Sequence, residues 1–322
     1  MAKVKTQNVT DRFSIYNADC LEGIAAMPDR SISYTVFSPP FVDLFCYSDS
    51  ERDFGNAKSY AEFFTMFDLL ANGLARVMKP GRLVSVHCID IPAMKERDGY
   101  IGLKDFPGDI IRSFQRAGFI YHSRTTIWKD PLIEAVRTKA LGLMHKQLCK
   151  DSTRCRSGLP DYLVTFRAPG DNAEPVTHPN GLSKYAGANN PDAKGGNLSH
   201  HIWRAYASPV WMDIRQTNVI SHKCAREEAD EKHICPLQLD VIERAITLWS
   251  NQGETVLTPF MGVGSECYGA VKLGRRAIGF ELKETYYRQA LRNIEMATQG
   301  VEPDEESLFA SDTTTETNAE EI

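Results

Sequence analysis

Short apolar runs alternate with amphipathic helical stretches along most of this chain, and this alternation limits the possible folds more than any other feature. The first half contains strand-like runs and helical stretches in turn, with strands expected at 13–18, 32–37, 82–88 and 119–128 and helices at 22–26, 60–77 and 106–117. Strands that alternate with helices form a mostly parallel sheet covered on both faces. We therefore expect an α/β fold.

The same alternation resumes near the end of the chain. Strands are predicted at 161–167, 254–257 and 276–281, and helices at 236–250, 265–273 and 284–298. Lys79-Pro80-Gly81 is expected to end the helix that begins at Tyr60. Residues 168–231 are rich in Pro, Gly, Asn, His and Ser without a sustained period, so we expect loops and short elements inserted into the core.

Acidic residues are concentrated at the C-terminal end. The chain has a net charge of −5, but residues 301–322 carry eight of its 42 acidic residues and none of its 37 basic ones. The remaining 34 acidic and 37 basic residues make the folded body slightly positive, so the net charge does not exclude a nucleic-acid partner. The tail cannot bury much surface, and we expect it to be disordered.

The chain has no sign of a membrane span, a signal region or a disulfide framework. No apolar stretch approaches the roughly 18 residues that a span requires, and Met1–Lys5 leads into no apolar region, so we expect a cytoplasmic protein. The eight cysteines include no Cys-x-x-Cys pair, which favours reduced thiols. His222, Cys224, His233 and Cys235 lack the usual zinc spacing, and we expect no metal.

Ser38-Pro39-Pro40-Phe41 directly follows the strand predicted at 32–37. The two prolines fix their own φ angles and lack N–H donors, so nearby carbonyls are left to accept hydrogen bonds. Phe41 adds an aromatic face on which a base can stack. Acceptors beside an aromatic ring suit the exocyclic amino group of an extruded nucleobase.

A glycine-rich turn at residues 258–265 lies between a predicted strand and a predicted helix. Gly262 and Gly264 allow the backbone of such a turn to approach a ligand closely. Glu281 ends the next strand, where an acid can accept hydrogen bonds from both hydroxyls of an adenosine ribose. The two features together indicate a cofactor that contains adenosine.

Two residues of this turn narrow the class of cofactor. A Gly-x-Gly-x-x-Gly turn receives the pyrophosphate of a nicotinamide cofactor, but Cys267 stands at the third glycine position. Phe260 precedes the glycines and leaves little room for a diphosphate. We therefore expect S-adenosylmethionine, which contains adenosine and no phosphate.

Short motifs follow one another in a set order, namely Asn17-Ala18-Asp19-Cys20, Ser38-Pro39-Pro40-Phe41, Pro236-Leu237-Gln238-Leu239 and Pro259 to Ser265. In this order they resemble the amino-methyltransferases of DNA of the beta class, in which the catalytic tetrapeptide precedes the cofactor turn. The resemblance spans most of the chain outside the insert and the tail. It implies a circularly permuted, Rossmann-like methyltransferase fold with a seven-stranded, mostly parallel sheet.

The resemblance also implies a division of roles. Ser38 and the Pro39 carbonyl would hold the target amino group, Pro40 would stiffen the corner, and Phe41 would stack on the base. Glu281 would bind the ribose and Asp19 the adenine. The complete set of expected cofactor-binding residues is Asp19, Cys20, Pro236, Thr258, Phe260, Gly262, Gly264, Ser265 and Glu281.

The chemistry of amino methylation explains these residue types. An exocyclic amino nitrogen is a poor nucleophile because its lone pair is delocalised into the ring. Acceptors that draw its hydrogens out of the ring plane localise that pair, and positioning in line with the methyl group lowers the barrier by about 7–11 kcal/mol in favourable cases. The reaction needs neither a metal nor a covalent nucleophile.

Ser38 is the main sequence clue to the target base. A serine at the first position accompanies cytosine N4 methylation in the related family, although it also occurs with adenine, so we favour cytosine N4 with adenine N6 as the alternative. A second hypothesis is amino methylation of RNA or of a protein. A third is a non-catalytic DNA-binding descendant, because Thr258 replaces the family's acid and Cys235 its lysine.

The motif order divides the chain into functional segments: a catalytic half at 1–132, a basic DNA-facing segment with the last strand at 133–167, a target-recognition insert at 168–231, a cofactor half at 232–299 and the acidic tail at 300–322. We expect the basic segment to contact DNA phosphates through Arg137, Lys139, Lys146, Lys150, Arg154 and Arg156. The expected partner is double-stranded DNA, and no membrane is expected; a homodimer and a cognate restriction enzyme are candidates that the sequence leaves open.

Overall fold

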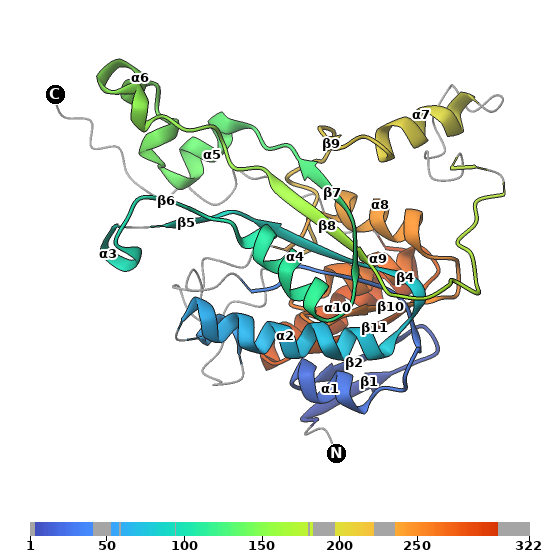
Figure 1. Ribbon diagram of the computed structural model, residues 1–322. Helices are drawn as coiled ribbons and strands as arrows, with labels where there is room; N and C mark the ends of the chain where they lie inside the picture. The colour runs from blue at the N-terminus through green and yellow to red at the C-terminus, as the bar shows by residue number, and fades with distance from the viewer. Residues whose placement is uncertain are drawn as a thin grey trace.

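A single large sheet forms the centre of the protein (Figure 1). The computed structural model describes residues 4–40, 53–57, 59–93, 95–179, 181–182, 197–221 and 236–301. The strands of the sheet are β1 (Thr6–Val9), β2 (Phe13–Asn17), β3 (Ile32–Phe37), β4 (Met78–Ile89), β7 (Ile120–Ile127), β8 (Asp161–Arg167), β9 (Val210–Trp211), β10 (Thr255–Thr258) and β11 (Arg276–Glu281). Their order across the sheet is β1-β2-β11-β10-β3-β4-β8-β7-β9.

The central strands β2, β11, β10, β3 and β4 run parallel, so their carboxyl ends meet at one edge of the sheet. β8 runs antiparallel to β4, and β7 antiparallel to β8. This confirms the predicted α/β class, with β10 and β11 late in sequence but central in space. The expected number of seven strands is wrong, because β1 and β9 extend the two edges to give a nine-stranded sheet.

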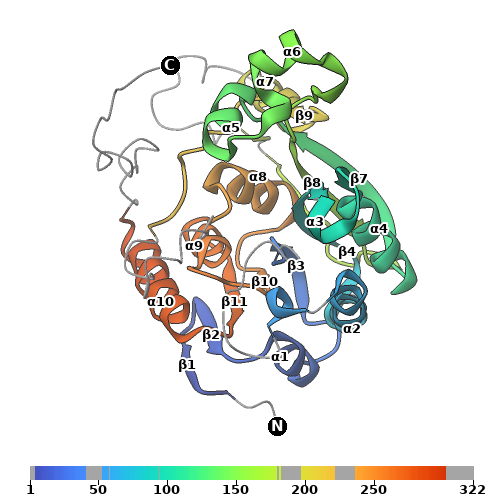
Figure 2. The same ribbon diagram turned by 90° about the vertical axis from the view of Figure 1, so that its left-hand side faces the viewer.

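Helices cover both faces of the sheet (Figure 2). One face carries α8 (Leu239–Trp249), α9 (Ser265–Lys272) and α10 (Glu284–Gln299), and the other carries α1 (Cys20–Ala26), α2 (Tyr60–Val77) and α4 (Phe106–Arg116). Successive residues of a strand point to opposite faces. Accordingly, Val256 packs into the core beneath α8 to α10, and Leu257 into the core beneath α1, α2 and α4.

Smaller elements lie outside these layers. β5 (Ile91–Ala93) and β6 (Gly102–Lys104) pair as a two-stranded sheet around α3 (Lys95–Asp98). The remaining elements are α5 (Pro131–Thr138), α6 (His145–Lys150), α7 (Asn197–Tyr206) and the 3-10 turns η1 (Phe54–Asn56), η2 (Leu141–Leu143) and η3 (Ser152–Arg154). None of the described helices is both long and apolar enough to cross a membrane.

Two predicted element boundaries are wrong. β4 begins at Met78 and not at Arg82, so Lys79, Pro80 and Gly81 belong to this strand and do not end the helix before it. The pairing of β4 with β3 accommodates these three residues through a register shift between Ile32 and Tyr34. α8 begins at Leu239 with Gln238 as its N-cap, so Pro236 precedes the helix and does not open it.

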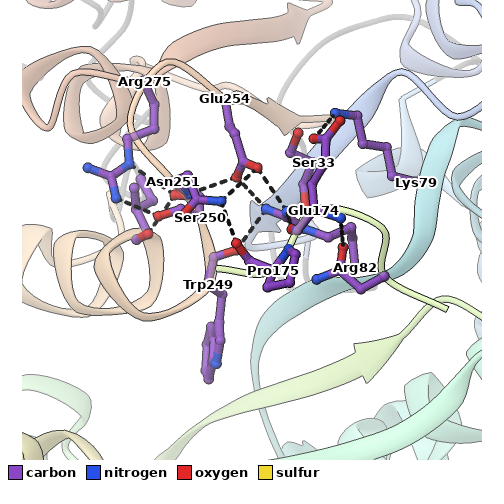
Figure 3. A network of polar contacts seen from close by, with 12 residues as sticks. Ser33, Lys79, Arg82, Glu174, Pro175, Trp249, Ser250, Asn251, Glu254 and Arg275 are labelled. Atoms are coloured by element: carbon purple, nitrogen blue, oxygen red, sulfur yellow. Dashed lines mark hydrogen bonds and ion pairs between the residues drawn. The ribbon is translucent and has the colours of Figure 1, made fainter. Parts of the chain in front are cut away.

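A buried ion pair fastens the edge of the sheet where β3, β4 and β10 begin (Figure 3). The Arg82 guanidinium pairs with the Glu254 carboxylate, and Arg82 is only 2% exposed. Arg82 also donates to the Ser33 carbonyl at 3.0 Å and to the Glu174 carbonyl at 2.9 Å. These contacts join β3, β4 and the residue before β10 to the segment after β8, at the edge opposite the carboxyl ends of the parallel strands.

Candidate active site

The catalytic tetrapeptide predicted from the sequence begins where β3 ends. β3 is buried along its whole length, with Phe37 at 0% exposure. Ser38 and Pro40 are half-buried, and Pro39 between them is buried. Phe41 lies outside the described residues. The structure therefore places a hydroxyl group and two prolines at the carboxyl edge of the sheet, where open α/β sheets bind their ligands.

The glycine-rich turn lies at the same edge, at the end of the neighbouring strand β10. Gly262 and Gly264 have positive φ angles of 52° and 94°, which favour glycine. A Cβ on Gly264 would lie 3.0 Å from the Ala290 backbone of α10, so this glycine permits close packing. A Cβ on Gly262 would meet no described heavy atom within 4 Å, which leaves its backbone open to a ligand.

Glu281 joins the turn to the end of β11. Its Oε2 atom accepts a hydrogen bond from the Gly262 N–H at 2.8 Å, and its Oε1 atom accepts one from the Lys283 N–H at 2.8 Å. The side chain keeps partial exposure, but its enclosed position raises the pKa of the carboxyl to about 7. Asp53 adds to this rise through charge repulsion, so a second carboxylate faces the same region.

Asp19 and Cys20 lie beside Glu281, because β2 is the neighbour of β11. The Ala18 N–H donates to the Glu281 carbonyl at 3.1 Å. Asp19 is the N-cap of α1, and its Oδ1 atom accepts hydrogen bonds from the Leu21 and Glu22 N–H groups at 2.8 and 3.1 Å. Cys20 is buried at the first position of that helix. Asp19 thus has a structural role, while its contact with adenine remains a prediction.

The remaining predicted cofactor residues surround the turn. Thr258 is 1% exposed, and its Oγ1 atom has no hydrogen-bond partner within the described part of the chain. Ser265 is the buried first residue of α9. Pro236 precedes Leu237, which packs into the same core as Met261 of the turn. An orphaned hydroxyl, an open glycine and an enclosed carboxylate suit a polar ligand such as an adenosine cofactor.

Packing between Phe37 and Phe260 brings the two predicted sites together. Their ring centroids are 5.7 Å apart, and Phe260 also packs against Phe54 at 5.0 Å. Phe37 directly precedes Ser38, and Phe260 lies two residues before Gly262, the open glycine of the turn. The hydroxyl of Ser38 and the glycine-rich turn therefore flank the same region of the sheet edge.

The structure adds three residues that the sequence did not indicate. Ser38 Oγ lies 3.2 Å from His87 Nδ1, and His87 Nε2 lies 3.3 Å from Asp161 Oδ2. Lys129 Nζ donates to Asp161 Oδ1 at 2.5 Å. Burial alone would raise the pKa of Asp161, but its contact with His87 and the charge and hydrogen bond of Lys129 lower it to about 2. Asp161 is therefore a stable anion behind His87.

Strand register explains this line of residues. Phe37 of β3 pairs with Val86 of β4, so Ser38 and His87 are the next residues along two parallel strands. His87 pairs with Leu163 of β8, and Asp161 points to the same face two residues away. Such diagonal neighbours are within reach of long side chains. The only local sequence signal was a histidine inside a predicted strand, and pairing over 74 positions is not visible in one sequence.

The expected DNA-contacting residues lie between β7 and β8, in a projection beyond the carboxyl edge of the sheet (Figure 1). Ile127 pairs with Asp161, so this projection begins and ends beside the line of residues behind Ser38. Lys139, Lys146, Lys150 and Arg154 are exposed, whereas the side chain of Arg137 is not described. Arg156 is only partly exposed. Its Nη2 atom lies 3.8 Å from Glu134 Oε1, and its guanidinium donates to the Ser157 carbonyl.

Comparison with known proteins supports a single family. The model of the N6/N4 methyltransferase family, described as DNA methylase, matches residues 32–292. The Type II methyltransferase M.BamHI of Bacillus amyloliquefaciens is 25% identical over 285 residues, which cover 87% of this chain and 57% of that protein. The chain thus spans little more than half the length of this relative.

Solved structures share the fold. TTHA0409 from Thermus thermophilus, in complex with S-adenosyl-L-methionine, superposes with a TM-score of 0.62 at 20% identity and covers 91% of this chain and 96% of its own. The cytosine-N4-specific PvuII DNA methyltransferase superposes with a TM-score of 0.59 at 18% identity, covering 92% of this chain and 94% of its own. At such identities the likeness concerns the fold alone.

Proposed function

Because the chain belongs to the DNA methylase family, whose model matches residues 32–292, we propose that it methylates an exocyclic amino group of a base in double-stranded DNA. The methyl donor is S-adenosyl-L-methionine. We favour N4 of cytosine as the target, and adenine N6 is the alternative.

The observation that supports this function most strongly is the contact between Phe37 and Phe260, with ring centroids 5.7 Å apart. It holds the residue before Ser38 against Phe260, which lies two residues before Gly262. A methyl transfer between two bound molecules requires both to be held in line, and correct placement accounts for much of the rate enhancement. A chain that only bound DNA would not need a cofactor turn next to the tetrapeptide.

The cofactor-facing residues each have a defined task in this function. The Glu281 carboxylate binds the ribose hydroxyls while it retains the Gly262 N–H, with which it already forms a 2.8 Å hydrogen bond. The Thr258 hydroxyl, which lacks a partner within the described residues, accepts a hydrogen bond from the methionine ammonium. The cofactor supplies an electrophilic methyl group when it is bound.

The residues of the tetrapeptide act on the base. Ser38 Oγ and the Pro39 carbonyl accept the two hydrogens of the amino group and thereby localise its lone pair. Phe41 stacks on the extruded base, and such stacking offsets about 1–3 kcal/mol of the cost of extrusion. Ser38 at the first position is the reason for favouring cytosine, since the tetrapeptide otherwise suits both amino groups.

We assign contacts with the phosphates of duplex DNA to the projection between β7 and β8. It starts and ends at the edge that carries Ser38, and its exposed cations Lys146 and Lys150 face solvent. Counterion release makes such contacts favourable in a sequence-independent manner. We assign the reading of sequence to residues 168–231. A second copy of the chain and a cognate restriction enzyme are further candidate partners.

Product analysis tests this function. The protein is incubated with methyl-labelled S-adenosyl-L-methionine and unmethylated genomic DNA, and the labelled nucleoside is identified after digestion. We expect labelled N4-methylcytosine. Labelled N6-methyladenine would support the alternative target, and label in RNA or protein but not in DNA would overturn the proposal. Ser38→Ala should abolish labelling and leave cofactor binding intact.

A further inference from the structure

Both ring nitrogens of His87 face polar atoms in the line behind Ser38. Nδ1 lies 3.2 Å from Ser38 Oγ, and Nε2 lies 3.3 Å from Asp161 Oδ2. The His87 side chain is 9% exposed and that of Asp161 is 7% exposed. A histidine that only filled the core would need no more than one polar neighbour. It would not need the Ser38 hydroxyl as a second one.

The anion at one end determines which nitrogen of His87 carries the proton. Asp161 is ionised, because burial, which would raise the pKa of its carboxyl, is outweighed by the nearby His87 and by the Lys129 ammonium, which hold that pKa at about 2. Because a carboxylate only accepts hydrogen bonds, we assign the ring hydrogen to Nε2, which faces Asp161 Oδ2 at 3.3 Å without a complete hydrogen bond among the described residues, and the lone pair to Nδ1. Ser38 then donates its hydroxyl hydrogen to Nδ1. The oxygen lone pairs of Ser38 remain available for an incoming amino group.

We propose that His87 is a positioning residue that turns Ser38 into an acceptor for the target amino group and receives, through Ser38, the proton that this group loses. This inference rests on the proposed function.

The step balances as a displacement coupled to a proton transfer. The amino nitrogen forms a bond to the methyl carbon while the carbon–sulfur bond breaks, and the electron pair of that bond stays on sulfur. One N–H proton moves to Ser38 Oγ as the Ser38 hydroxyl proton moves to His87 Nδ1. The resulting imidazolium lies between Ser38 and the Asp161 anion, which stabilises it, and it later returns the proton to water. This is the logic of a base held in one tautomer by a carboxylate.

Lys129 makes a buried anion tolerable in this arrangement. Without a counter-charge, a carboxylate that is 7% exposed would carry a large desolvation cost. Its ammonium contacts Asp161 Oδ1, the oxygen that does not face His87, at 2.5 Å. One carboxylate oxygen of Asp161 therefore contacts the Lys129 ammonium, and the other faces the imidazole of His87.

Variants of His87 separate proton transfer from simple support. In His87→Asn the amide oxygen can take the place of Nδ1 and accept from Ser38, but the amide cannot take up a proton. His87→Ala removes both functions. We expect single-turnover methyl transfer to fall by about 100-fold or more in both variants, the usual range for general base catalysis. Dissociation constants for S-adenosyl-L-methionine and for DNA should change by less than about threefold, since both are measured before the proton moves.

Asp161→Asn provides the matched test of the tautomer. Its amide can donate to Nε2, which would place the hydrogen on Nδ1 and prevent Ser38 from donating there. We expect a loss similar to that of His87→Asn, with ¹⁵N NMR reporting the Nε2–H form of His87 in the wild type and the Nδ1–H form in this variant.

Three results would count against the proposal in different ways. Wild-type rates in His87→Asn would mean that an acceptor alone suffices and that no proton reaches His87. An Nδ1–H form in the wild-type protein would remove the basis of the argument. A wild-type protein that labels no DNA would overturn the proposed function itself and this inference with it.

Discussion

The Glu281 carboxylate accepts the N–H of Gly262 at 2.8 Å, and this single contact joins the end of β11 to the turn after β10. The predicted ribose-binding acid and the predicted ligand-facing glycine are thus one unit. Any change in the charge of Glu281 acts on the turn as well as on the ribose that we propose Glu281 to bind.

Cofactor affinity should weaken on acidification because of Glu281. Enclosure raises the pKa of its carboxyl to about 7, from an ordinary value of 4.5. A protonated carboxyl cannot accept from both ribose hydroxyls and from Gly262. We expect the affinity for S-adenosyl-L-methionine to fall below pH 7, approaching about tenfold per pH unit for one proton taken up on cofactor release. Isothermal titration calorimetry between pH 5.5 and 8.5 measures this change.

The raised pKa of Glu281 has the opposite effect on the stability of the free protein, which is greater at low pH. A raised pKa stabilises the fold below the unfolded value near 4.5, and this contribution is lost as the pH rises through about 7.

Glu281→Gln tests whether Glu281 causes the pH dependence of cofactor affinity. This variant should bind the cofactor weakly with little dependence on pH. Asp53→Asn is the control, and it should bring the midpoint to a lower pH by removing a repulsive charge. A pH dependence that persists unchanged in Glu281→Gln would assign it to another group.

Thr258→Val should separate cofactor affinity from stability. The Oγ1 atom of Thr258 is buried without a partner in the described residues, so its removal costs the free protein no hydrogen bond. We expect the free energy of unfolding to stay within about 1 kcal/mol of the wild type and the dissociation constant of S-adenosyl-L-methionine to rise by about tenfold, the value of a hydrogen bond to a charged group. Calorimetry measures both the free energy of unfolding and the dissociation constant. A loss of stability without a loss of affinity would show that Thr258 supports the fold instead.

The sequence predicted the elements with strong periodicity and missed the weak ones. β3, α2 and β11 begin and end within a residue of their predicted limits, because apolar spacing and caps mark them clearly. β1 was missed because it is a short edge strand with mostly exposed residues. α6 was missed because it is short, begins without a side-chain cap and buries none of its residues.

The site was predictable to the extent that its residues follow one another in sequence motifs. Ser38 and Glu281 were expected at strand ends, and the structure places both there. Strand pairing brings Asp161 and Lys129 close to His87, and His87 in turn contacts Ser38. Their distance in sequence leaves no local pattern, so only tertiary structure reveals them.

Glu254→Gln should destabilise the fold without affecting catalysis. It leaves the Arg82 guanidinium, which is 2% exposed, without its counter-charge, at the sheet edge opposite Ser38. Loss of one partner of a buried pair costs about 3 kcal/mol or more. Urea unfolding measures the difference. Burial alone would raise the pKa of Glu254, but the hydrogen bond from Arg82 lowers it, so the difference should shrink as the pH falls below 4.5.

Glu243→Gln is the matched control for this prediction. It breaks the Lys272–Glu243 pair, whose side chains are 29% and 28% exposed, and such pairs contribute less than about 1 kcal/mol. An equal loss of stability in both variants would contradict the special contribution of the buried pair.

Neutralising Lys146 and Lys150 should weaken DNA binding without slowing the chemical step. Both side chains are exposed in the projection between β7 and β8 and lie away from the cofactor turn. If each contacts a phosphate, the Lys146→Gln/Lys150→Gln variant should reduce the slope of log affinity against log salt by about 1.8. The single-turnover rate at saturating DNA should be unchanged. Arg156→Gln is the matched control, because Arg156 is only partly exposed and is engaged with Glu134 and Ser157. An unchanged salt slope in the double variant, or an equal change in the control, would place the DNA on another surface.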